Sequence, residues 1–528
     1  LKLTSSSARS CSPTFVGCSS PAMWRASGVL GAACTAAYWH VPNQRRRTAV
    51  RAEERRTFDI AVVGGGLVGL AVAREAAARG ASVVLLEREQ TVAASASGGN
   101  TGLGHTGYDA PEGSLERRLL RRAISLHPAL YRSFGMGMSH CRKCGSLVVA
   151  WTPAQLSALD AVLQENVNAG DTDAYRVNAE ELRDLEPALS PAALGAVVCP
   201  NEAVVEPFLI PIGYAESARR HGAELRLSTE VTSVERQDGV WRIGIGKSAL
   251  AVDGRSKPGE LLVQPLKEAA APSEAETVSA RCVVNCAGLW GDELEAMRLG
   301  GGEPPFHVTP RKGQFLVFDT DVEVEYILEM VPTQFTKGVI VWSTTYGNVI
   351  VGPTATNQTN KADRSTDEET INSLKAWAVK AVPALKDAKV LGTYSGLRPA
   401  TEFRDYQIKA HPEERWITVG GIRSTGLTAC CAIGEYVMEL VEDMDGAPQP
   451  DRLPERPMLG VSGAKKRLVQ ARSRINLEPV PSLAELAADF RSSGDGTVSV
   501  YGRRWLVSHP LSSFGMESYS GKQGGVTS

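Results

Sequence analysis

The sequence lacks an apolar run long enough to cross a membrane and lacks a strong excess of either charge. Its most apolar N-terminal stretch, residues 26–38, is too short to span about 30 Å of hydrocarbon as a helix. Lys and Arg number 57 and Asp and Glu number 59, which gives a net charge of −2. Because nucleic acids and anionic membranes attract clustered positive charge, this balance argues for neither partner. We therefore expect no transmembrane segment and no bound nucleic acid.

Cysteine is also sparse, with ten residues spread along 528. A secreted disulfide framework is dense and confined to a short domain, so this distribution argues against one. Cys141 and Cys144 are spaced like a metal or redox pair, but no second pair of that spacing follows, and a structural zinc needs four ligands. We expect no metal site, and a functional disulfide between these two residues is the alternative.

Acidic residues are absent before Glu53, where Ser, Ala, Cys and Arg dominate instead. This composition is typical of a transit peptide. Residues 1–52 are therefore predicted to be a leader that is removed in an organelle, either a plastid or a mitochondrion. The sequence Val50-Arg51-Ala52 resembles a plastid processing site and slightly favours the plastid. An unstructured extension that carries no address is the alternative.

A dinucleotide-binding pattern follows this segment. The apolar run 58–63 leads directly into Gly64-Gly65-Gly66-Leu67-Val68-Gly69, and an Ala-rich segment of helical character continues to Arg79. A strand, a glycine turn and a helix in this order are typical of a Rossmann-like unit. The first glycine permits the tight turn, the third lets the backbone approach a pyrophosphate, and the last lets helix and strand pack closely.

A second apolar run, residues 82–86, ends at Glu87, about 20 residues after the glycines. A carboxylate at this position accepts hydrogen bonds from ribose hydroxyls, and it would repel the 2′-phosphate of NADP. The pattern predicts a bound dinucleotide but does not by itself separate FAD from NAD.

Further motifs follow in a fixed order along the chain. They are SASGGNTG at 95–102 leading to GHTGY at 104–108, STEV at 228–231, VVNCAGLW at 283–290, PRKGQF at 310–315, GLRP at 396–399 and GGIRSTGLT at 420–428. Over about residues 57–445 this series resembles the FAD-binding oxidoreductases of the D-amino-acid-oxidase-like superfamily. The branch that it resembles contains L-2-hydroxyglutarate dehydrogenase and the anaerobic type of glycerol-3-phosphate dehydrogenase.

The resemblance implies FAD, held without a covalent bond. Together with the glycine pattern it implies cofactor contacts from the following residues: Gly64, Gly65, Gly66, Leu67, Val68, Gly69, Glu87, Arg88, Ser95, Ser97, Gly98, Asn100, Thr101, Gly102, Val231, Ala287, Gly288, Trp290, Gly421, Gly426, Leu427 and Thr428.

The resemblance also implies an α/β fold, in which a discontinuous Rossmann-like FAD-binding domain is joined to a mixed-sheet α+β substrate domain. The FAD-binding pieces are expected at 57–140, 200–295 and 390–445, and the substrate domain at 141–199 and 296–389. Residues 247–280, rich in Lys, Glu, Pro and Ala, are predicted to be a surface insertion. Residues 460–528 form an extension whose role the sequence does not reveal, with a helix expected at 482–490 and a hairpin at 497–507.

A flavin accepts a hydride at its ring nitrogen N5, so the protein must hold the donor carbon nearby and manage a proton. Oxidation of an alcohol needs a base for the hydroxyl proton, and histidine suits that task near neutral pH. Among eight histidines, only His105 directly follows a cofactor motif. We predict that it faces the substrate, and a buried histidine bonded to backbone is the alternative.

Arg398 in the GLRP motif resembles the arginine that binds the substrate carboxylate in amino-acid oxidases and that has a counterpart in the glycerol-phosphate enzymes. A guanidinium group can bind carboxylate or phosphate at two points. Arg423 and Lys312 are weaker candidates for a second cation, and Tyr108 for a hydrogen-bonding partner in the pocket. Ordinary salt bridges, or packing for the tyrosine, are the alternatives.

These residues predict an FAD-dependent dehydrogenase or oxidase that acts on a small anionic substrate, either a 2-hydroxy acid or glycerol-3-phosphate. No iron–sulfur cysteine cluster follows the flavin motifs, so the electron acceptor is open between oxygen, a quinone and a separate carrier protein. An amino-acid or amine oxidase is the second possibility. A non-catalytic FAD-binding subunit of an organellar complex is the third.

Overall fold

The computed structural model describes residues 57–248, 250–252, 263–265, 276–331, 338–445 and 475–521. The predicted leader at 1–52 lies outside these residues, as do most of the predicted insertion at 247–280 and the start of the C-terminal extension. All described residues belong to one unit, Glu54–Ser528. None of the helices in them combines the length and the apolar character that a membrane crossing requires.

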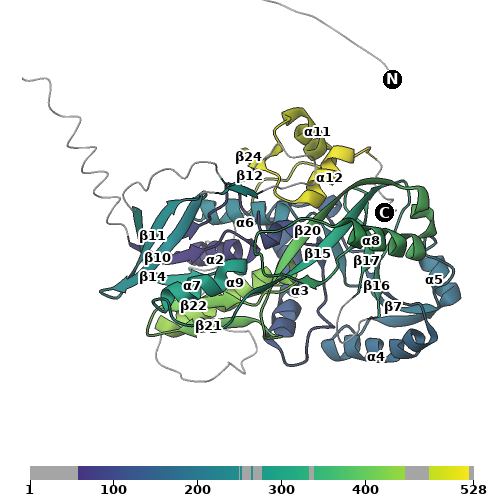
Figure 1. The fold of residues 1–528 in the computed structure, drawn as a ribbon, viewed down its shortest axis with the longest axis horizontal. Helices are drawn as coiled ribbons and strands as arrows, with labels where there is room; N and C mark the ends of the chain where they lie inside the picture. Colours follow the sequence, from purple (N-terminus) through teal and green to yellow (C-terminus); the bar gives the residue numbers. More distant parts are fainter. Residues whose placement is uncertain are drawn as a thin grey trace, which may run out of the picture. The chain divides into compact units, whose positions relative to one another are not determined.

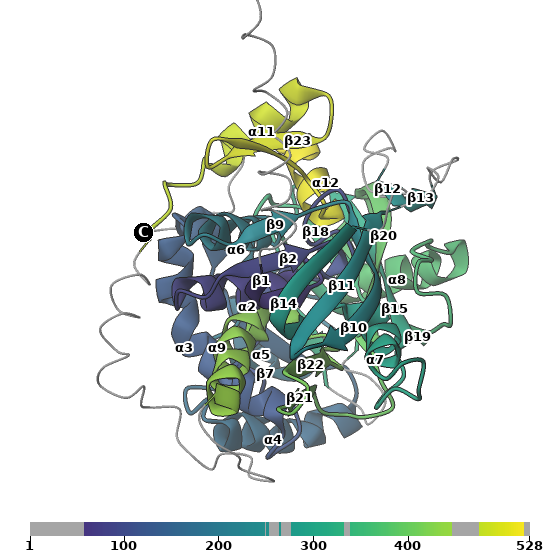
Figure 2. The ribbon, with the colours of Figure 1, turned by 90° about the vertical axis from the view of Figure 1, so that its left-hand side faces the viewer.

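The first sheet carries the predicted dinucleotide unit (Figure 2). Strand β1 (Thr57–Val63) pairs in parallel with β2 (Val83–Leu86) and with β14 (Glu276–Asn285), and helix α2 (Leu67–Ala78) connects β1 to β2. The strand order is β10-β11-β14-β1-β2-β9, and β22 joins β14 and carries β21. The remaining strands of this sheet are β9 (Glu224–Arg226), β10 (Thr229–Gln237), β11 (Val240–Lys247), β21 (Gln407–His411) and β22 (Trp416–Gly420).

Both faces of β1 are covered, which explains why its sequence is almost continuously apolar. Ile60 and Val62 point into a core that includes side chains of helices α2, α3 (Leu115–Ser133), α6 (Leu209–Arg220) and α9 (Gly426–Asp445), whereas Ala61 and Val63 point into a core shared with β10 and β11. Helix α7 (Gly291–Arg298) lies on the opposite face.

The second sheet is mixed and has the order β19-β15-β18-β17-β16-β5-β7-β6, with β20 paired to β15. Its strands are β5 (Ser146–Ala150), β6 (Tyr175–Asn178), β7 (Gly195–Cys199), β15 (Thr309–Asp319), β16 (Ile327–Met330), β17 (Ile340–Ser343), β18 (Val349–Gly352), β19 (Thr356–Asn357) and β20 (Lys389–Ala400). Helices α4 (Pro153–Ala169), α5 (Ala179–Leu185) and α8 (Glu368–Ala381) pack on its strands. Strand β20 falls in a piece predicted to belong to the FAD-binding domain, yet it hydrogen-bonds along β15 and so belongs to this second sheet.

Short elements complete the fold. They are β3 (Leu103–Gly104), β4 (Cys141–Arg142), β8 (Ala203–Val205), β12 (Leu250–Val252) and β13 (Val263–Pro265), with 3₁₀ turns η1 (Ala96–Gly99), η2 (Met138–His140), η3 (Gly288–Trp290) and η4 (Pro383–Asp387). Strands β3, β8 and β4 form a small sheet of their own. The predicted α/β fold class, with an FAD-binding part and a mixed-sheet part, is confirmed.

The C-terminal extension forms helix α11 (Leu483–Ser493), the hairpin β23 (Thr497–Val500) and β24 (Arg503–Leu506), and helix α12 (Pro510–Ser518). Figure 1 shows these elements in yellow. The helix and the hairpin lie where the sequence predicts them. Side chains of α11 and β23 belong to the same core as α2 and α9, and α12 packs against β15, β20 and η1.

Candidate active site

A cavity of about 780 Å³ is lined by residues of both sheets. Sixteen of the predicted cofactor residues form part of its wall: Gly64, Gly66, Leu67, Val68, Glu87, Arg88, Ser95, Ser97, Asn100, Thr101, Val231, Ala287, Gly288, Trp290, Gly426 and Leu427. The motifs that lie far apart in the sequence are therefore brought together around one space.

The turn between β1 and α2 has the form that a bound pyrophosphate requires. Gly64 has a φ of +107°, and a Cβ there would lie 2.4 Å from the carbonyl oxygen of Cys286. No side chain caps α2 from Gly66, and the N–H of Leu67 donates to Ser97 Oγ at 3.0 Å. Because the N-terminus of a helix carries unpaired N–H groups and partial positive charge, this end of the cavity fits a phosphate group.

The end of β2 supplies the carboxylate predicted for a ribose. Glu87 Oε2 accepts a hydrogen bond from the Gly65 N–H at 2.5 Å, and Oε1 accepts one from the Glu89 N–H at 2.8 Å. Burial raises the pKa of Glu87, while these two backbone donors lower it. The guanidinium carbon of Arg88 lies 3.4 Å from the ring centroid of Trp290. This stacked pair gives the cavity a flat wall beside the carboxylate, and together these residues fit the adenosine half of FAD.

The other six predicted cofactor residues stand behind the wall: Gly65, Gly69, Gly98, Gly102, Gly421 and Thr428. Gly69 sits so close to the turn that a Cβ there would lie 1.9 Å from the carbonyl oxygen of Gly64. Gly102 has a φ of +67°, and its N–H donates to the Asn100 side chain at 2.8 Å. Thr428 Oγ1 accepts the backbone N–H of His105 at 3.1 Å. These residues therefore support the shape of the cavity without facing it.

Besides Arg88 at the adenosine end, four arginines of the described residues line the cavity: Arg311, Arg398, Arg404 and Arg423. Arg311 on β15 lies directly opposite Arg398 on the antiparallel β20, so their side chains share one face of the sheet. Burial and the positive charges of Arg311 and Arg423 lower the pKa of Arg398 to about 10. Burial and Arg311 also lower the pKa of Arg423.

No carboxylate of the described residues forms a salt bridge with any of these four guanidinium groups. The hydrogen bonds of Arg398 go to backbone, with Nη1 donating to the Thr354 carbonyl at 3.2 Å and to the Arg311 carbonyl at 3.5 Å. Buried or clustered cations are normally paired, because an uncompensated charge is costly to desolvate. The cluster therefore fits an anionic ligand, and Arg398 is placed where the sequence predicts it.

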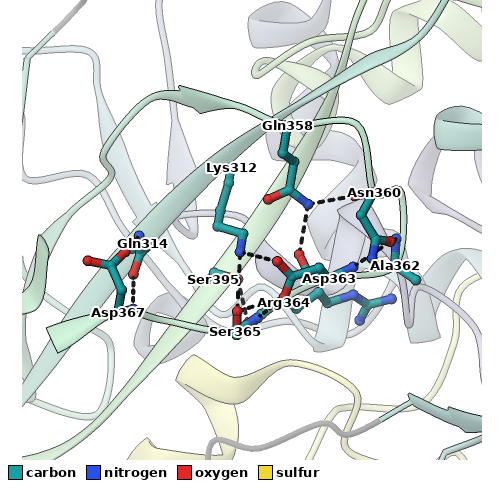
Figure 3. A network of polar contacts seen from close by, with 10 residues as sticks. All are labelled: Lys312, Gln314, Gln358, Asn360, Ala362, Asp363, Arg364, Ser365, Asp367 and Ser395. Carbon is teal, nitrogen blue, oxygen red and sulfur yellow. Dashed lines mark hydrogen bonds and ion pairs between the residues drawn. The ribbon is translucent and has the colours of Figure 1, made fainter.

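Lys312 and Tyr108, both predicted site residues, do not line the cavity. Side chains alternate along a strand, so Lys312 leaves β15 on the face opposite to Arg311. Its Nζ lies 2.8 Å from Asp363 Oδ2 (Figure 3), and the hydrogen bond from Lys312 lowers the pKa of Asp363 to about 2. This placement does not fit a substrate-binding role for the lysine, because its charge is already paired outside the cavity. Tyr108 is buried, and its hydroxyl donates to Glu329 at 3.3 Å.

His105 lines the cavity as predicted. Its Nδ1 lies 3.6 Å from Oε1 of Glu202, a buried residue that does not reach the cavity itself. One ligand atom from each of His105, Glu202 and Glu329 lies within 4.8 Å of the others, a grouping that could hold a metal ion. The prediction of no metal site rested on the cysteine pair Cys141 and Cys144 and did not consider this grouping, whose three residues are far apart along the chain.

Sequence reasoning missed three site residues. Arg311 could have been found from the strand pattern PRKGQF, since Arg311, Gly313 and Phe315 alternate on one face and all line the cavity. Arg404 lies in a loop without periodicity, and Glu202 sits behind a histidine that is distant in sequence. No local signal marked either of them.

Comparisons with known proteins identify the family. The family described as FAD dependent oxidoreductase matches residues 59–440. Glycerol 3-phosphate dehydrogenase of Caloramator mitchellensis is 27% identical over 390 residues, which cover 73% of this chain and 74% of that protein. Human mitochondrial L-2-hydroxyglutarate dehydrogenase is 27% identical over 270 residues, 51% of this chain and 53% of that one.

Among solved structures, the dithionite-reduced L-alpha-glycerophosphate oxidase of Mycoplasma pneumoniae with FAD bound superimposes with a TM-score of 0.62. It is 25% identical, and the match covers 73% of this chain and 95% of that one. The predicted cofactor, FAD, is confirmed by the family and by this structure. Since the family match spans well over half of the chain, this protein belongs to the family of FAD-dependent oxidoreductases related to D-amino-acid oxidase.

Proposed function

We propose that this enzyme oxidises the secondary alcohol of glycerol-3-phosphate to the ketone, with a 2-hydroxy acid as the second candidate substrate. The observation that carries the proposal is the group Arg311, Arg398, Arg404 and Arg423 in the cavity wall, none of which forms a salt bridge with a carboxylate of the described residues. A phosphate monoester carries about −1.5 to −2 charge near neutral pH, whereas a carboxylate carries one. Several guanidinium groups in one cavity therefore favour a phosphate over a monocarboxylate, whereas a dicarboxylate such as 2-hydroxyglutarate carries a similar total charge and stays the second candidate. Relatives named for glycerol 3-phosphate and for 2-hydroxyglutarate support the same two candidates.

Each cavity residue has a separate task in this proposal. Arg398 and Arg311 lie side by side on paired strands and bind the anionic group at fixed positions. His105, on the loop that follows β3, takes the proton of the substrate hydroxyl. FAD, when bound, supplies the acceptor for the hydride that leaves the same carbon. The apolar residues Leu397, Phe315 and Ile340 also line the cavity and limit the water around the reacting carbon.

Anaerobic absorbance spectroscopy of the purified flavoprotein tests the proposal. The oxidised flavin band is recorded before and after addition of glycerol-3-phosphate, L-2-hydroxyglutarate or glycine, each at the same concentration. We expect rapid bleaching by glycerol-3-phosphate, slower or no bleaching by the other two, and release of one ketone per flavin. Bleaching by glycine alone would instead indicate an amine oxidase. A flavin that none of the three compounds bleaches would refute the proposed substrate class.

A further inference from the structure

The buried carboxylate of Glu202 lies behind His105 and has no role in the reaction proposed above. Glu202 is 1% exposed, and its Oε1 accepts the backbone N–H of Thr106 at 3.2 Å. The same oxygen lies 3.6 Å from His105 Nδ1, while Oε2 has no hydrogen-bond partner among the described residues. A buried carboxylate is costly unless it is paired and hydrogen-bonded, so its surroundings must explain it.

The contacts of Glu202 keep its carboxylate ionised. Burial raises the pKa of Glu202, but the contacts with His105 and with the Thr106 N–H lower it by more, so the pKa lies below its ordinary value. The carboxylate therefore remains ionised at neutral pH. In the described part of the chain, His105 is the only basic side chain recorded within 4 Å of this carboxylate.

The backbone fixes this pairing. Strands β3 and β8 are antiparallel, with Leu103 opposite Val204 and Gly104 opposite Ala203. His105 follows β3 by one residue and Glu202 precedes β8 by one residue, so the ladder brings these two positions side by side. The Thr428 hydroxyl also holds the backbone N–H of His105. The strand register therefore places the two residues next to each other, and their side chains make the contact.

We propose that Glu202 is a positioning residue for His105. It holds Nδ1 on the side away from the cavity and stabilises the positive imidazolium that forms when Nε2 takes the hydroxyl proton. This inference rests on the proposed function, in which His105 is the base. The 3.6 Å separation is longer than a hydrogen bond, so the attraction strengthens once the ring gains its proton.

Two other groups face the same histidine. Glu329 on β16 belongs to the cluster within 4.8 Å and accepts the Tyr108 hydroxyl, and Thr428 binds the His105 backbone. Because Tyr108 already donates to Glu329, we assign the orienting role to the more deeply buried Glu202. A divalent cation held by His105 and both carboxylates is the competing arrangement.

A double-mutant cycle tests the proposal in the holoenzyme. The limiting rate of anaerobic flavin reduction by glycerol-3-phosphate is measured for Glu202→Gln, His105→Ala and the double variant. A contact with a charged group contributes about 1.5–3 kcal/mol, which corresponds to about a 10–100-fold loss of rate in Glu202→Gln. The apparent substrate affinity should change little, because the arginines set it. In the His105→Ala background, the second substitution should cost nothing further.

Glu206→Gln is the matched control. Glu206 is another buried carboxylate, four residues along, and it bonds the Ser512 hydroxyl and the Leu209 N–H instead of a histidine. It should leave the reduction rate unchanged. Multiplicative losses in the double variant, or an equal loss in Glu206→Gln, would overturn the positioning role, because both results would show a general effect of changing a buried carboxyl group.

A second measurement is independent of the substrate. In protein labelled with ¹⁵N-histidine, the His105 signal, assigned by its loss in His105→Ala, reports which ring nitrogen carries the proton. We expect Nδ1–H in the neutral wild-type ring and a shift toward the other tautomer in Glu202→Gln. An unchanged tautomer overturns the proposal even if glycerol-3-phosphate is the substrate. The expected shift supports it even if another substrate is found. One equivalent of tightly bound metal that disappears in Glu202→Gln would overturn it in favour of the cation.

Discussion

Arg398 offers a test in which affinity and stability move in opposite directions. Its guanidinium group is partly buried in the cavity wall, faces Arg311 and Arg423, and has only backbone carbonyls as partners. Replacement by Met keeps the length of the side chain and removes the charge. We expect Arg398→Met to bind the anionic substrate more weakly and to be more stable in its absence.

The magnitudes follow from the pKa and from the lost contact. Burial and the neighbouring arginines lower the pKa of Arg398 from 12.5 to about 10. One pKa unit corresponds to about 1.4 kcal/mol, so the charged form is disfavoured in the empty site by about 3 kcal/mol. Loss of backbone hydrogen bonds offsets part of this, which leaves a gain in stability of about 1–2 kcal/mol. A charge-assisted contact with substrate contributes about 1.5–3 kcal/mol, so affinity should fall about 10–100-fold.

The assay combines thermal unfolding of the substrate-free holoenzyme with a substrate titration of flavin bleaching. Lys312→Met is the matched control, since it removes a cation from the neighbouring position on β15 that is paired with Asp363 outside the cavity. It should lose about 1 kcal/mol of stability, the usual value of a partly exposed ion pair, with unchanged substrate affinity.

The opposite pattern would refute the reasoning. If Arg398→Met were destabilised with unchanged affinity, the cluster would be a structural feature and not an anion site. Lys312→Met could also weaken substrate binding as much as Arg398→Met does. That result would show that Lys312 contacts the substrate, against its placement on the face of β15 that points away from the cavity.

Three further outcomes are expected. Gly69→Ala should yield protein without bound FAD, because its Cβ would lie 1.9 Å from the Gly64 carbonyl oxygen, whereas Gly246→Ala, with its nearest atom at 3.6 Å, should retain the flavin spectrum. Burial raises the pKa of Glu206 to about 7, so the folded state holds a proton that the unfolded state has lost, and stability should fall by up to about 3 kcal/mol as pH rises from about 4.5 to 7. Urea unfolding at several pH values should show a flatter profile for Glu206→Gln. Removal of residues 446–528 should lower the unfolding temperature and the flavin content, because it uncovers a core built partly from α11 and β23; full flavin content and an unchanged unfolding temperature would contradict this.

The FAD half of the site could be predicted because its signals are local. One strand-turn-helix-strand unit contains both the glycine turn after β1 and the carboxylate of Glu87 at the end of β2. In the structure, a Cβ at each of these glycines would lie close to neighbouring atoms. The helix and hairpin of the C-terminal extension were predictable for the same reason, since a capping serine and a turn glycine act on their immediate neighbours.

The substrate half depends on pairings between distant segments. Arg398 faces Arg311 only because β15 and β20 pair in one register, across 87 residues of chain. A shift of one residue would have brought Lys312 to that face instead. Glu202 lies beside His105 because β3 pairs with β8. Strand β3 has two residues and β8 has three, which is too short for a sequence pattern that would predict their pairing. Residue types alone therefore indicated an anion site but not which cations form it.

The C-terminal extension lies beyond the family match, which ends at residue 440, and it packs behind the wall of the site. Helix α12 packs against both η1 and β20, which contribute Ser97 and Arg398 to the cavity wall. A Cβ at Gly98 would lie 2.9 Å from the Ser508 carbonyl oxygen, and burial lowers the pKa of His509 to about 3, so that this ring stays neutral beside Tyr394. This neutral, close-packed surface leaves η1 little room to move. The extension therefore holds Ser97 of η1 in place, and Ser97 Oγ accepts the N–H of Leu67 at the start of α2.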